Sequence, residues 1–348
     1  MAGRIRNPGR ELSLRENAKI HESPGSGIAI DMGASHLRFV LASVEGQILE
    51  EARERVHSEA GPAGVIAQIR EGVANLIRDK SELGTLRGIA IGVPGGVDPQ
   101  TGKVVDANNV PGWREEDMGR ELEQVFHVPV FLDNDANMAA IGEHWRGVAR
   151  DIKDFVFIAL GTGIGAGIFV NGRICRGRNG FAGELFRMNL EWPRWSEDFP
   201  DTGYLETYIS GMGLAKLGGK LVANGNGDQP ARLADQRDAR YVFEALHQGD
   251  AGARSLIEQS FVMLGVAVAN VVSVLDPELI VFNGGLVKGA PDLLLETVDK
   301  VVRKMQPKAP KIALSTLGDK AQIWGALHTL LEPAQQCAIR SAQKCSAS

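Results

Sequence analysis

The amino-acid sequence predicts an α/β protein with two similarly built lobes. Strand-like and helix-like segments alternate along most of the chain, which is typical of α/β architecture. The chain has 348 residues, more than a single hydrophobic core usually organises. Residues 27–49 and 155–174 share one plan, in which two apolar runs are joined by a glycine-containing turn and followed by a Glu-Gly or Asn-Gly turn. This weak repeat suggests that each lobe begins with a strand, a tight loop and a strand.

The two ends of the chain are polar. Residues 1–25 and 333–348 have mixed charge and little apolar content, so we expect a flexible arm and a flexible tail. The first segment has no apolar core and does not fit a secretory signal. We expect an N-terminal lobe from residues 26–132 plus 312–332, because the last helix should return to the first lobe. Residues 133–311 should form the second lobe.

The composition is that of an ordinary globular protein, with 44% hydrophobic and 23% charged residues. A net charge of −5 argues against a general nucleic-acid partner. The three cysteines, Cys175, Cys337 and Cys345, form no CxxC pattern, which argues against a disulfide framework and fits the cytoplasm. The apolar run from Phe261 to Leu275 ends at Asp-Pro and reads as a buried helix, so no membrane partner is expected.

The stretch VPVFLDNDANMAA, residues 128–140, places a polar cluster between a buried strand and a helix-forming run. The cluster is Asp133, Asn134 and Asp135. Two interpretations are open from the residues alone. Either aspartate could cap the helix, which is a common role for that residue. Alternatively, a carboxylate at the mouth of a strand could accept a proton in catalysis.

Three glycine-containing loops follow apolar strands. Gly161, Thr162 and Gly163 begin a G-x-G-x-x-G/A pattern, but a β-branched run and a hairpin turn follow it where a dinucleotide-binding fold needs a helix. A glycine-rich turn between strands instead exposes backbone N–H groups to a phosphate. No GxxxxGK[ST] phosphate loop is present, since the sequence around Lys220 lacks the upstream glycine and the following hydroxyl residue.

The other two loops suit the remaining parts of a nucleotide. The first has a similar geometry and a carboxylate for a water-ligated Mg²⁺, and its candidate residues are Asp31, Gly33, Ser35 and Arg38. The third follows the strand ELIVF and contains Gly284 and Gly285, which suit a flat base lying against the backbone. Three such loops together favour nucleotide binding over simple tight turns.

In the order and content of its motifs, the chain resembles the ROK family of sugar kinases and sugar-responsive repressors, from about Gly27 to Leu331. Five segments carry the resemblance: DMGASHLR, GVPGGVDPQTGKVVDANNVPGW, DNDANMAAIGE, GTGIGAGIFVNGRICRGRNGFAGE and LDPELIVFNGG. The resemblance implies the two-lobed actin-like ATPase (ribonuclease H-like) fold, with a cleft between the lobes. It also implies ATP and Mg²⁺ as cofactors, a hexose substrate and a homodimer.

The same resemblance assigns roles to individual residues. Asp135 would be the general base that takes a proton from the sugar hydroxyl attacking the γ-phosphate, and Asp133 a structural acid. The residues expected to hold sugar hydroxyls are Asn109, Asn134, Glu184 and Glu206. Glucose phosphorylated at its 6-position is the default substrate.

The chain departs from the family in one loop. Many members have a histidine three residues after Glu184 and then a cysteine-rich zinc loop, whereas here Arg187 occupies the histidine position and WPRWSEDFPDTGYLE contains no cysteine. Zinc is therefore not expected, and we expect packing of Trp192, Trp195 and Phe199 to hold the loop. Arg187 either enters the sugar site or points outward to pair with Glu191 or Asp198.

Several alternatives stay open. Within the kinases, the substrate could be an N-acylmannosamine, allose or fructose. From another class, the chain could be a sugar-binding regulator without chemistry. DNA binding is not expected, because only thirty residues precede Asp31 and the family's repressors carry a winged helix-turn-helix there.

Overall fold

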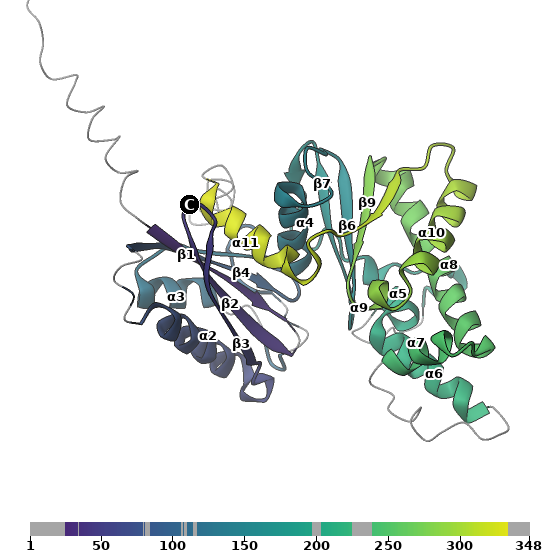
Figure 1. Ribbon diagram of the computed structural model, residues 1–348, viewed down its shortest axis with the longest axis horizontal. Coiled ribbons are helices and arrows are strands. Elements are labelled where there is room, and N and C mark those ends of the chain that lie inside the picture. The colour runs from purple at the N-terminus through teal and green to yellow at the C-terminus, as the bar shows by residue number, and fades with distance from the viewer. Residues whose placement is uncertain are drawn as a thin grey trace, which may run out of the picture.

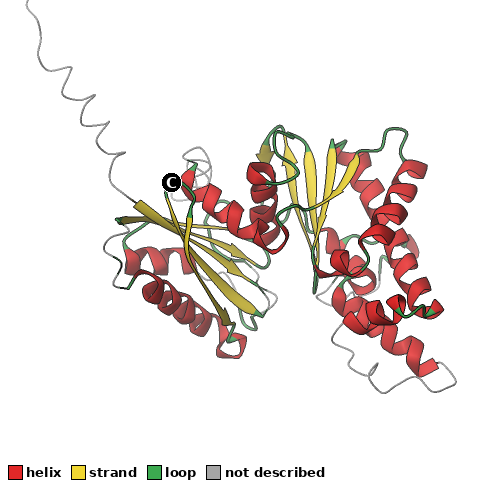
Figure 2. Cartoon of the chain, viewed as in Figure 1, coloured by secondary structure: helices red, strands yellow, loops and turns green. Residues whose placement is uncertain are grey.

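Two five-stranded sheets stand side by side in the computed structural model of the chain (Figure 1). The structure describes residues 25–33, 35–78, 80, 84–105, 107, 110–113, 117–196, 203–224 and 239–332. Most of the predicted arm and the whole predicted tail lie outside these residues, as do Asn109, Asp198 and Phe199. Helices flank both sheets, so the predicted α/β class is confirmed (Figure 2).

The first sheet has the strand order β3-β2-β1-β4-β5. Its strands are β1 (Gly25–Met32), β2 (His36–Ser43), β3 (Ile48–Arg55), β4 (Thr85–Val93) and β5 (Val130–Asn134). The pairs β1–β2 and β2–β3 are antiparallel, and the pairs β1–β4 and β4–β5 are parallel. Helices α2 (Gly61–Ile77) and α3 (Met118–Phe126) cover one face of the sheet (Figure 1). The apolar residues of α2 recur at helical spacing, as in Val65, Ile69 and Val73, so one side of it is buried in the core.

The second sheet repeats this plan. Its strands are β6 (Phe155–Leu160), β7 (Ile164–Val170), β8 (Arg173–Ile174), β9 (Leu279–Asn283) and β10 (Lys311–Leu314), in the order β10-β9-β6-β7-β8. The pairs β6–β7 and β7–β8 are antiparallel, and β6–β9 and β9–β10 are parallel. The predicted repeat is therefore confirmed at the level of topology. The predicted Asn-Gly turn is confirmed too, because Asn171 and Gly172 both have positive φ, 54° and 73°.

One face of the second sheet carries a helical layer (Figure 1). This layer comprises α5 (Tyr204–Ile209), α6 (Gly211–Asn224), α7 (Arg240–His247), α8 (Ala251–Leu275), α9 (Gly285–Gly289) and α10 (Pro291–Met305). In the described part of the chain, α8 is the one helix long and apolar enough to cross a membrane, but 56% of its most apolar window is buried. It packs on α10 and the sheet, as the core helix of a globular domain does.

Helices α4 (Asp135–Arg146) and α11 (Ala321–Leu331) lie between the sheets (Figure 1). Two glycines let their backbones approach closely. A Cβ at Gly142 would lie 2.1 Å from the carbonyl oxygen of Ala321, and one at Gly325 would lie 1.7 Å from that of Met138. α11 also packs on β1 and β4. The lobe boundaries at 132 and 312 stay a prediction, and the pairing of β10 with β9 favours counting residues 311–314 with the second lobe.

Candidate functional site

A cavity of about 490 Å³ lies where the end of β5, the β6–β7 hairpin, α5 and the start of α11 meet. Its lining residues are Pro94, Gly95, Asn134, Asp135, Ala159, Gly161, Thr162, Gly163, Ile164, Gly165, Ala166, Glu184, Phe186, Glu206, Met212 and Gln322. Seven of the residues proposed from the sequence are thus brought together: Asn134, Asp135, Gly161, Thr162, Gly163, Glu184 and Glu206. The cavity is also lined by Gly95, Phe186, Met212 and Gln322, residue types that carry no chemical signature in a single sequence.

Asn134 caps the helix that follows β5. Its side-chain oxygen accepts hydrogen bonds from the backbone N–H groups of Ala136, at 2.9 Å, and Asn137, at 3.2 Å. Its amide nitrogen donates to the carbonyl oxygen of Gly95 at 2.8 Å, which ties the end of β5 to the loop after β4. The helix cap is therefore an asparagine, and the two aspartates are left for other roles.

Asp135 occupies the first turn of α4 and lines the cavity. One of its oxygens accepts the N–H of Ala136 at 2.7 Å. Burial raises the pKa of Asp135 to about 6, and backbone hydrogen bonds from Ala136 and from Asp135 itself oppose that rise. A carboxylate with a pKa just below neutrality is ionised at pH 7 and still basic enough to accept a proton.

Asp31 is the penultimate residue of β1, and the charge of Asp135 acts on it. Burial raises the pKa of Asp31 to about 7, and the negative charge of Asp135 is the next cause. Arg38 and Arg53 lower this pKa, while Asp319 adds to the rise. The charge of Asp135 therefore disfavours the charged form of Asp31, and a cation beside Asp31 would relieve this repulsion.

The donor chemistry around Asp31 fits Mg²⁺ only with help from other ligands. Mg²⁺ prefers oxygen ligands and usually keeps several waters beside one or two carboxylates. Among the described residues, no group of three or more His, Cys, Asp or Glu side chains could hold a metal ion. A magnesium ion here would need water and phosphate oxygens in addition to the carboxylate.

Glu206 points from α5 toward the β6–β7 hairpin. Its Oε2 accepts the backbone N–H of Ile164 at 2.7 Å. Burial raises the pKa of Glu206, and the hydrogen bond from Ile164 opposes that rise. A Cβ at residue 163 would lie 2.5 Å from Oε2 of Glu206, so the absence of a side chain at Gly163 leaves room for this carboxylate. Glu184 lies before the short helix η3 (Leu185–Arg187) and lines the same cavity.

The expected phosphate-binding loops lie at the same end of the two sheets, with different access to the cavity. In the β6–β7 turn, the position of a Cβ on Gly161 has no atom within 4 Å, so there is space for a ligand on this side of the turn. The N–H of Gly161 itself donates to the carbonyl oxygen of Gly163 at 2.9 Å. Gly284 needs to be glycine, because its φ is +118° and a Cβ would lie 2.2 Å from the carbonyl oxygen of Leu160. Gly285 begins α9. Neither Gly284 nor Gly285 lines the cavity.

The first loop differs from its expected role in one respect. Gly33 closes the β1–β2 turn by donating its N–H to the carbonyl oxygen of His36 at 3.0 Å, and Ser35 is exposed beside it. The guanidinium of Arg38, however, is already engaged by Glu51 at 2.6 Å and by the carbonyl oxygen of Asp319 at 3.1 Å. Arg38 can contact a phosphate only by giving up or sharing these contacts.

Arg187 does not reach the cavity. It is exposed, and its guanidinium carbon lies 4.8 Å from the centroid of the Phe186 ring. Phe186 itself is buried and lines the cavity. Of the two expected orientations of Arg187, the structure therefore contains the outward one. The expected partner Glu191 pairs with Arg194 instead, at 3.6 Å. Arg187 stacks on the outer side of a ring that shapes the site.

The expected packing of the two loop tryptophans is wrong. Trp192 and Trp195 are 83% and 79% exposed. Arg194, on the short helix η4 (Trp192–Arg194), instead donates to the hydroxyl of Tyr208 at 2.5 Å and lies 5.5 Å from the ring centroid of the buried Tyr204. The sequence signal misled because aromatic area stabilises a loop only where a core lies beneath it. A cation between two tyrosines of α5 anchors this loop.

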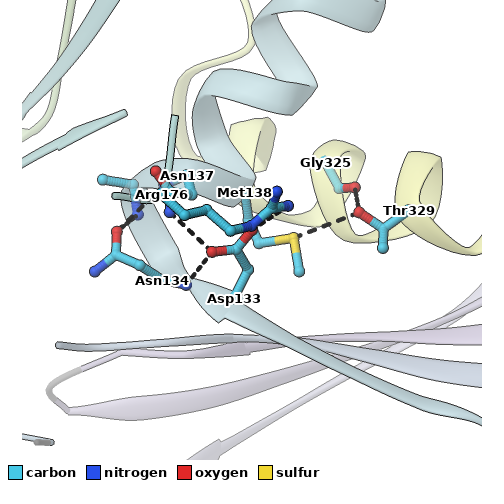
Figure 3. A network of polar contacts seen from close by, with 8 residues as sticks. Asp133, Asn134, Asn137, Met138, Arg176, Gly325 and Thr329 are labelled. Atoms are coloured by element: carbon cyan, nitrogen blue, oxygen red, sulfur yellow. Dashed lines mark hydrogen bonds and ion pairs between the residues drawn. The ribbon is translucent and has the colours of Figure 1, made fainter. Parts of the chain in front are cut away.

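Asp133 is 2% exposed and is held by four contacts (Figure 3). Its Oδ2 lies 2.8 Å from both Nε and Nη2 of Arg176. Its Oδ1 accepts the backbone N–H of Asn134 and the side-chain amide of Asn137, each at 2.8 Å. A buried carboxylate needs a partner, so the sequence could have indicated a cation. It could not show which arginine of GRICRGRNG would supply it.

Comparison with known proteins gives consistent matches over this whole region. The ROK family model matches residues 27–332. A glucokinase of Halalkalibacterium halodurans is 32% identical over 312 residues, which cover 86% of this chain and 92% of that protein. A xylose repressor of Caldicellulosiruptor bescii is 27% identical over 324 residues, which cover 89% of this chain and 79% of that protein.

A solved structure supports the same relationship. The ROK family glucokinase of Streptomyces griseus, crystallised in complex with glucose and AMPPNP, superimposes with a TM-score of 0.69 at 26% identity. The superposition covers 87% of this chain and 98% of that one. The residues matched by the family model, 27–332, include nearly all of both sheets, the cavity and the glycine loops.

Proposed function

This chain belongs to the ROK family and is a sugar kinase with the actin-like ATPase fold, and we propose that it transfers the γ-phosphoryl group of ATP to a hexose hydroxyl with Asp135 as general base. The observation that carries the proposal is a partly buried carboxylate with a raised pKa in a cavity shared by a glycine loop and two glutamates. ATP use is supported by the AMPPNP bound in the Streptomyces griseus glucokinase.

In the proposed reaction, Asp135 accepts the proton of the sugar hydroxyl as that oxygen attacks the γ-phosphorus. The backbone N–H groups of Thr162 and Gly163 would face the transferring phosphate from one side, since the N–H of Gly161 donates to the carbonyl oxygen of Gly163 at 2.9 Å. The loop after Asp31 faces it from the other, and Mg²⁺ would neutralise charge on the phosphate oxygens there. Phosphoryl transfer depends mainly on such positioning and charge neutralisation. Closure of the lobes would exclude water and limit hydrolysis of ATP.

The sugar would lie against the polar side chains of the cavity. We assign its hydroxyls to Asn134, Glu184 and Glu206, and to Asn109, which lies outside the described residues. A polyol presents donors and acceptors that must all be paired in a buried site, and amides and carboxylates provide both kinds of partner. Glucose is the first candidate, because a glucokinase is among the similar proteins and glucose occupies the Streptomyces griseus enzyme. The homodimer and the cytoplasmic location stay predictions.

A coupled assay of ADP release tests this function. Purified protein with ATP and Mg²⁺ is offered glucose, mannose, fructose, allose, N-acetylmannosamine and N-acetylglucosamine. Turnover with at least one of these sugars, lost in Asp135→Asn, is the expected result. An N-acetylglucosamine kinase of Vibrio cholerae is also 28% identical over 310 residues, so the acylated sugars belong in the panel.

A second candidate function is sugar sensing without catalysis. The similarity to xylose repressors favours it, since the Caldicellulosiruptor bescii repressor matches 89% of this chain and the Halalkalibacterium halodurans glucokinase matches 86%. The Asp135→Asn variant separates the two functions. A kinase loses turnover and keeps sugar affinity, whereas a sensor shows no turnover before or after the change.

A further inference from the structure

The ion pair between Asp133 and Arg176 joins the two sheets. Asp133 is the fourth residue of β5 in the first sheet, and Arg176 follows β8 in the second. Two backbone hydrogen bonds anchor the arginine segment to its own lobe. The N–H of Cys175 donates to Ile168 at 2.7 Å, and the carbonyl oxygen of Arg176 accepts the N–H of Ala182 at 3.2 Å. The pair therefore spans the lobes where β5 gives way to α4.

The carboxylate of this pair is buried and the guanidinium is partly buried. The side chain of Asp133 is 3% exposed and that of Arg176 is 19% exposed. A charge removed from water this far requires an opposite charge and hydrogen bonds, and removal of one partner leaves the other uncompensated. Both carboxylate oxygens of Asp133 are in use, with Arg176 on Oδ2 and Asn134 and Asn137 on Oδ1. Few orientations of this carboxylate satisfy all four contacts.

The contacts of Asp133 lead directly to the residues that line the cavity. The backbone N–H held by Oδ1 belongs to Asn134, whose own side chain caps α4 and binds Gly95. The amide held by the same oxygen belongs to Asn137, in the first turn of α4. Asp135 lies between these two held residues. Figure 3 shows Arg176 lying across this turn, with its guanidinium on Asp133.

We propose that Arg176 is a positioning residue for phosphoryl transfer: through Asp133 it fixes the end of β5 and the first turn of α4 against the second lobe. Arg176 is not among the residues that line the cavity, so it acts on the reaction through Asp133, Asn134 and Asn137. The planar guanidinium donates a hydrogen bond from Nε to Oδ2 and keeps Nη2 2.8 Å from the same oxygen as an ion-pair contact, an arrangement that a lysine ammonium cannot reproduce. This inference rests on the proposed kinase function.

The test compares three variants in the sugar-panel assay: Arg176→Met, Arg176→Lys and the matched control Arg178→Met. Arg178 lies two residues away in the same segment and is exposed. Arg176→Met should lower kcat about 10- to 100-fold, because displacement of a catalytic group by about 1 Å can cost a factor of about 100. The KM for ATP should change less than about threefold. Arg176→Lys should recover part of kcat, and Arg178→Met should match the wild type.

Each outcome decides the inference. If Arg176→Met keeps wild-type kcat, or loses kcat no more than Arg178→Met, Arg176 has no positioning role although the kinase function stands. If thermal stability falls while kcat at 25 °C is unchanged, the role is structural only. If even the wild type phosphorylates no sugar, the proposed kinase function is wrong. Amide hydrogen exchange then tests whether Arg176 fixes the end of β5 and the first turn of α4. Exchange in residues 134–138 should then be at least about tenfold faster in Arg176→Met than in Arg178→Met, and equal rates would overturn the inference.

Discussion

Replacement of Asp135 by asparagine should lower activity and raise stability at the same time. Asparagine keeps the shape of the side chain and an oxygen that can accept the N–H of Ala136, so the first turn of α4 should be retained. It cannot accept a proton from the sugar. Loss of a positioned general base typically lowers kcat by a factor of about 10² to 10⁴. Sugar affinity should change little, because asparagine can still bond a hydroxyl.

The gain in stability follows from the pKa of Asp135. Its folded-state pKa of about 6 lies above the ordinary value of 3.8, so the carboxylate is harder to ionise in the folded protein than in the unfolded chain. The raised pKa favours the folded state in its protonated form at low pH, and this contribution is lost as pH rises through about 6. At pH 8, a rise of about two pKa units corresponds to a penalty of about 3 kcal/mol, which the neutral asparagine would remove. At pH 5 roughly half of that difference should remain.

Two measurements on the same variant check this reasoning. Denaturant unfolding at pH 8 and pH 5 gives the free energy of unfolding, with the wild type as reference. Steady-state turnover at pH 8 gives kcat. A variant that keeps more than about a tenth of wild-type kcat would refute the role of general base. A variant no more stable than the wild type at pH 8 would refute the claim that burial of this charge destabilises the fold.

Three further outcomes are expected. The kcat/KM of the wild type should fall about tenfold per pH unit below about pH 6, because Asp135 must be ionised; a flat profile down to pH 5 would contradict this. Gly163→Ala should raise the sugar KM about tenfold with a smaller effect on the ATP KM, because its Cβ would displace the carboxylate of Glu206. Trp192→Ser should leave the unfolding temperature unchanged, whereas Arg194→Ala should lower the free energy of unfolding by about 1–3 kcal/mol, because it removes a charged hydrogen bond. Equal effects of these last two changes in thermal unfolding would show that the loop is not held as described.

The architecture was predictable where local chemistry determines it. The Asn171-Gly172 dipeptide specifies a hairpin turn without reference to the rest of the chain. The strand Val130–Asn134 and the helix after it follow from an apolar run and an abrupt change to polar residues. The same order of strand, glycine-containing turn and strand occurs in both halves of the sequence and predicts two similar lobes. The matching strand orders of the two sheets confirm this repeat.

The parts that the sequence could not give depend on contacts between distant segments. Arg176 meets Asp133 across 43 positions, and three neighbouring arginines were equal candidates. Trp192 is 83% exposed, whereas Arg194 of the same short helix contacts the tyrosines of α5, and the composition of the loop does not reveal this difference. Arg187 likewise lies outside the cavity, over the ring of Phe186, which is buried and lines the cavity.

A crystal structure of the protein with an ATP analogue, Mg²⁺ and the preferred sugar tests the central claim most directly. The sugar hydroxyl nearest the γ-phosphorus should lie within about 3 Å of a carboxylate oxygen of Asp135, with the triphosphate against the Gly161–Gly163 turn. A bound sugar whose nearest hydroxyl to the γ-phosphorus contacts another group, or a triphosphate away from that turn, would contradict the account.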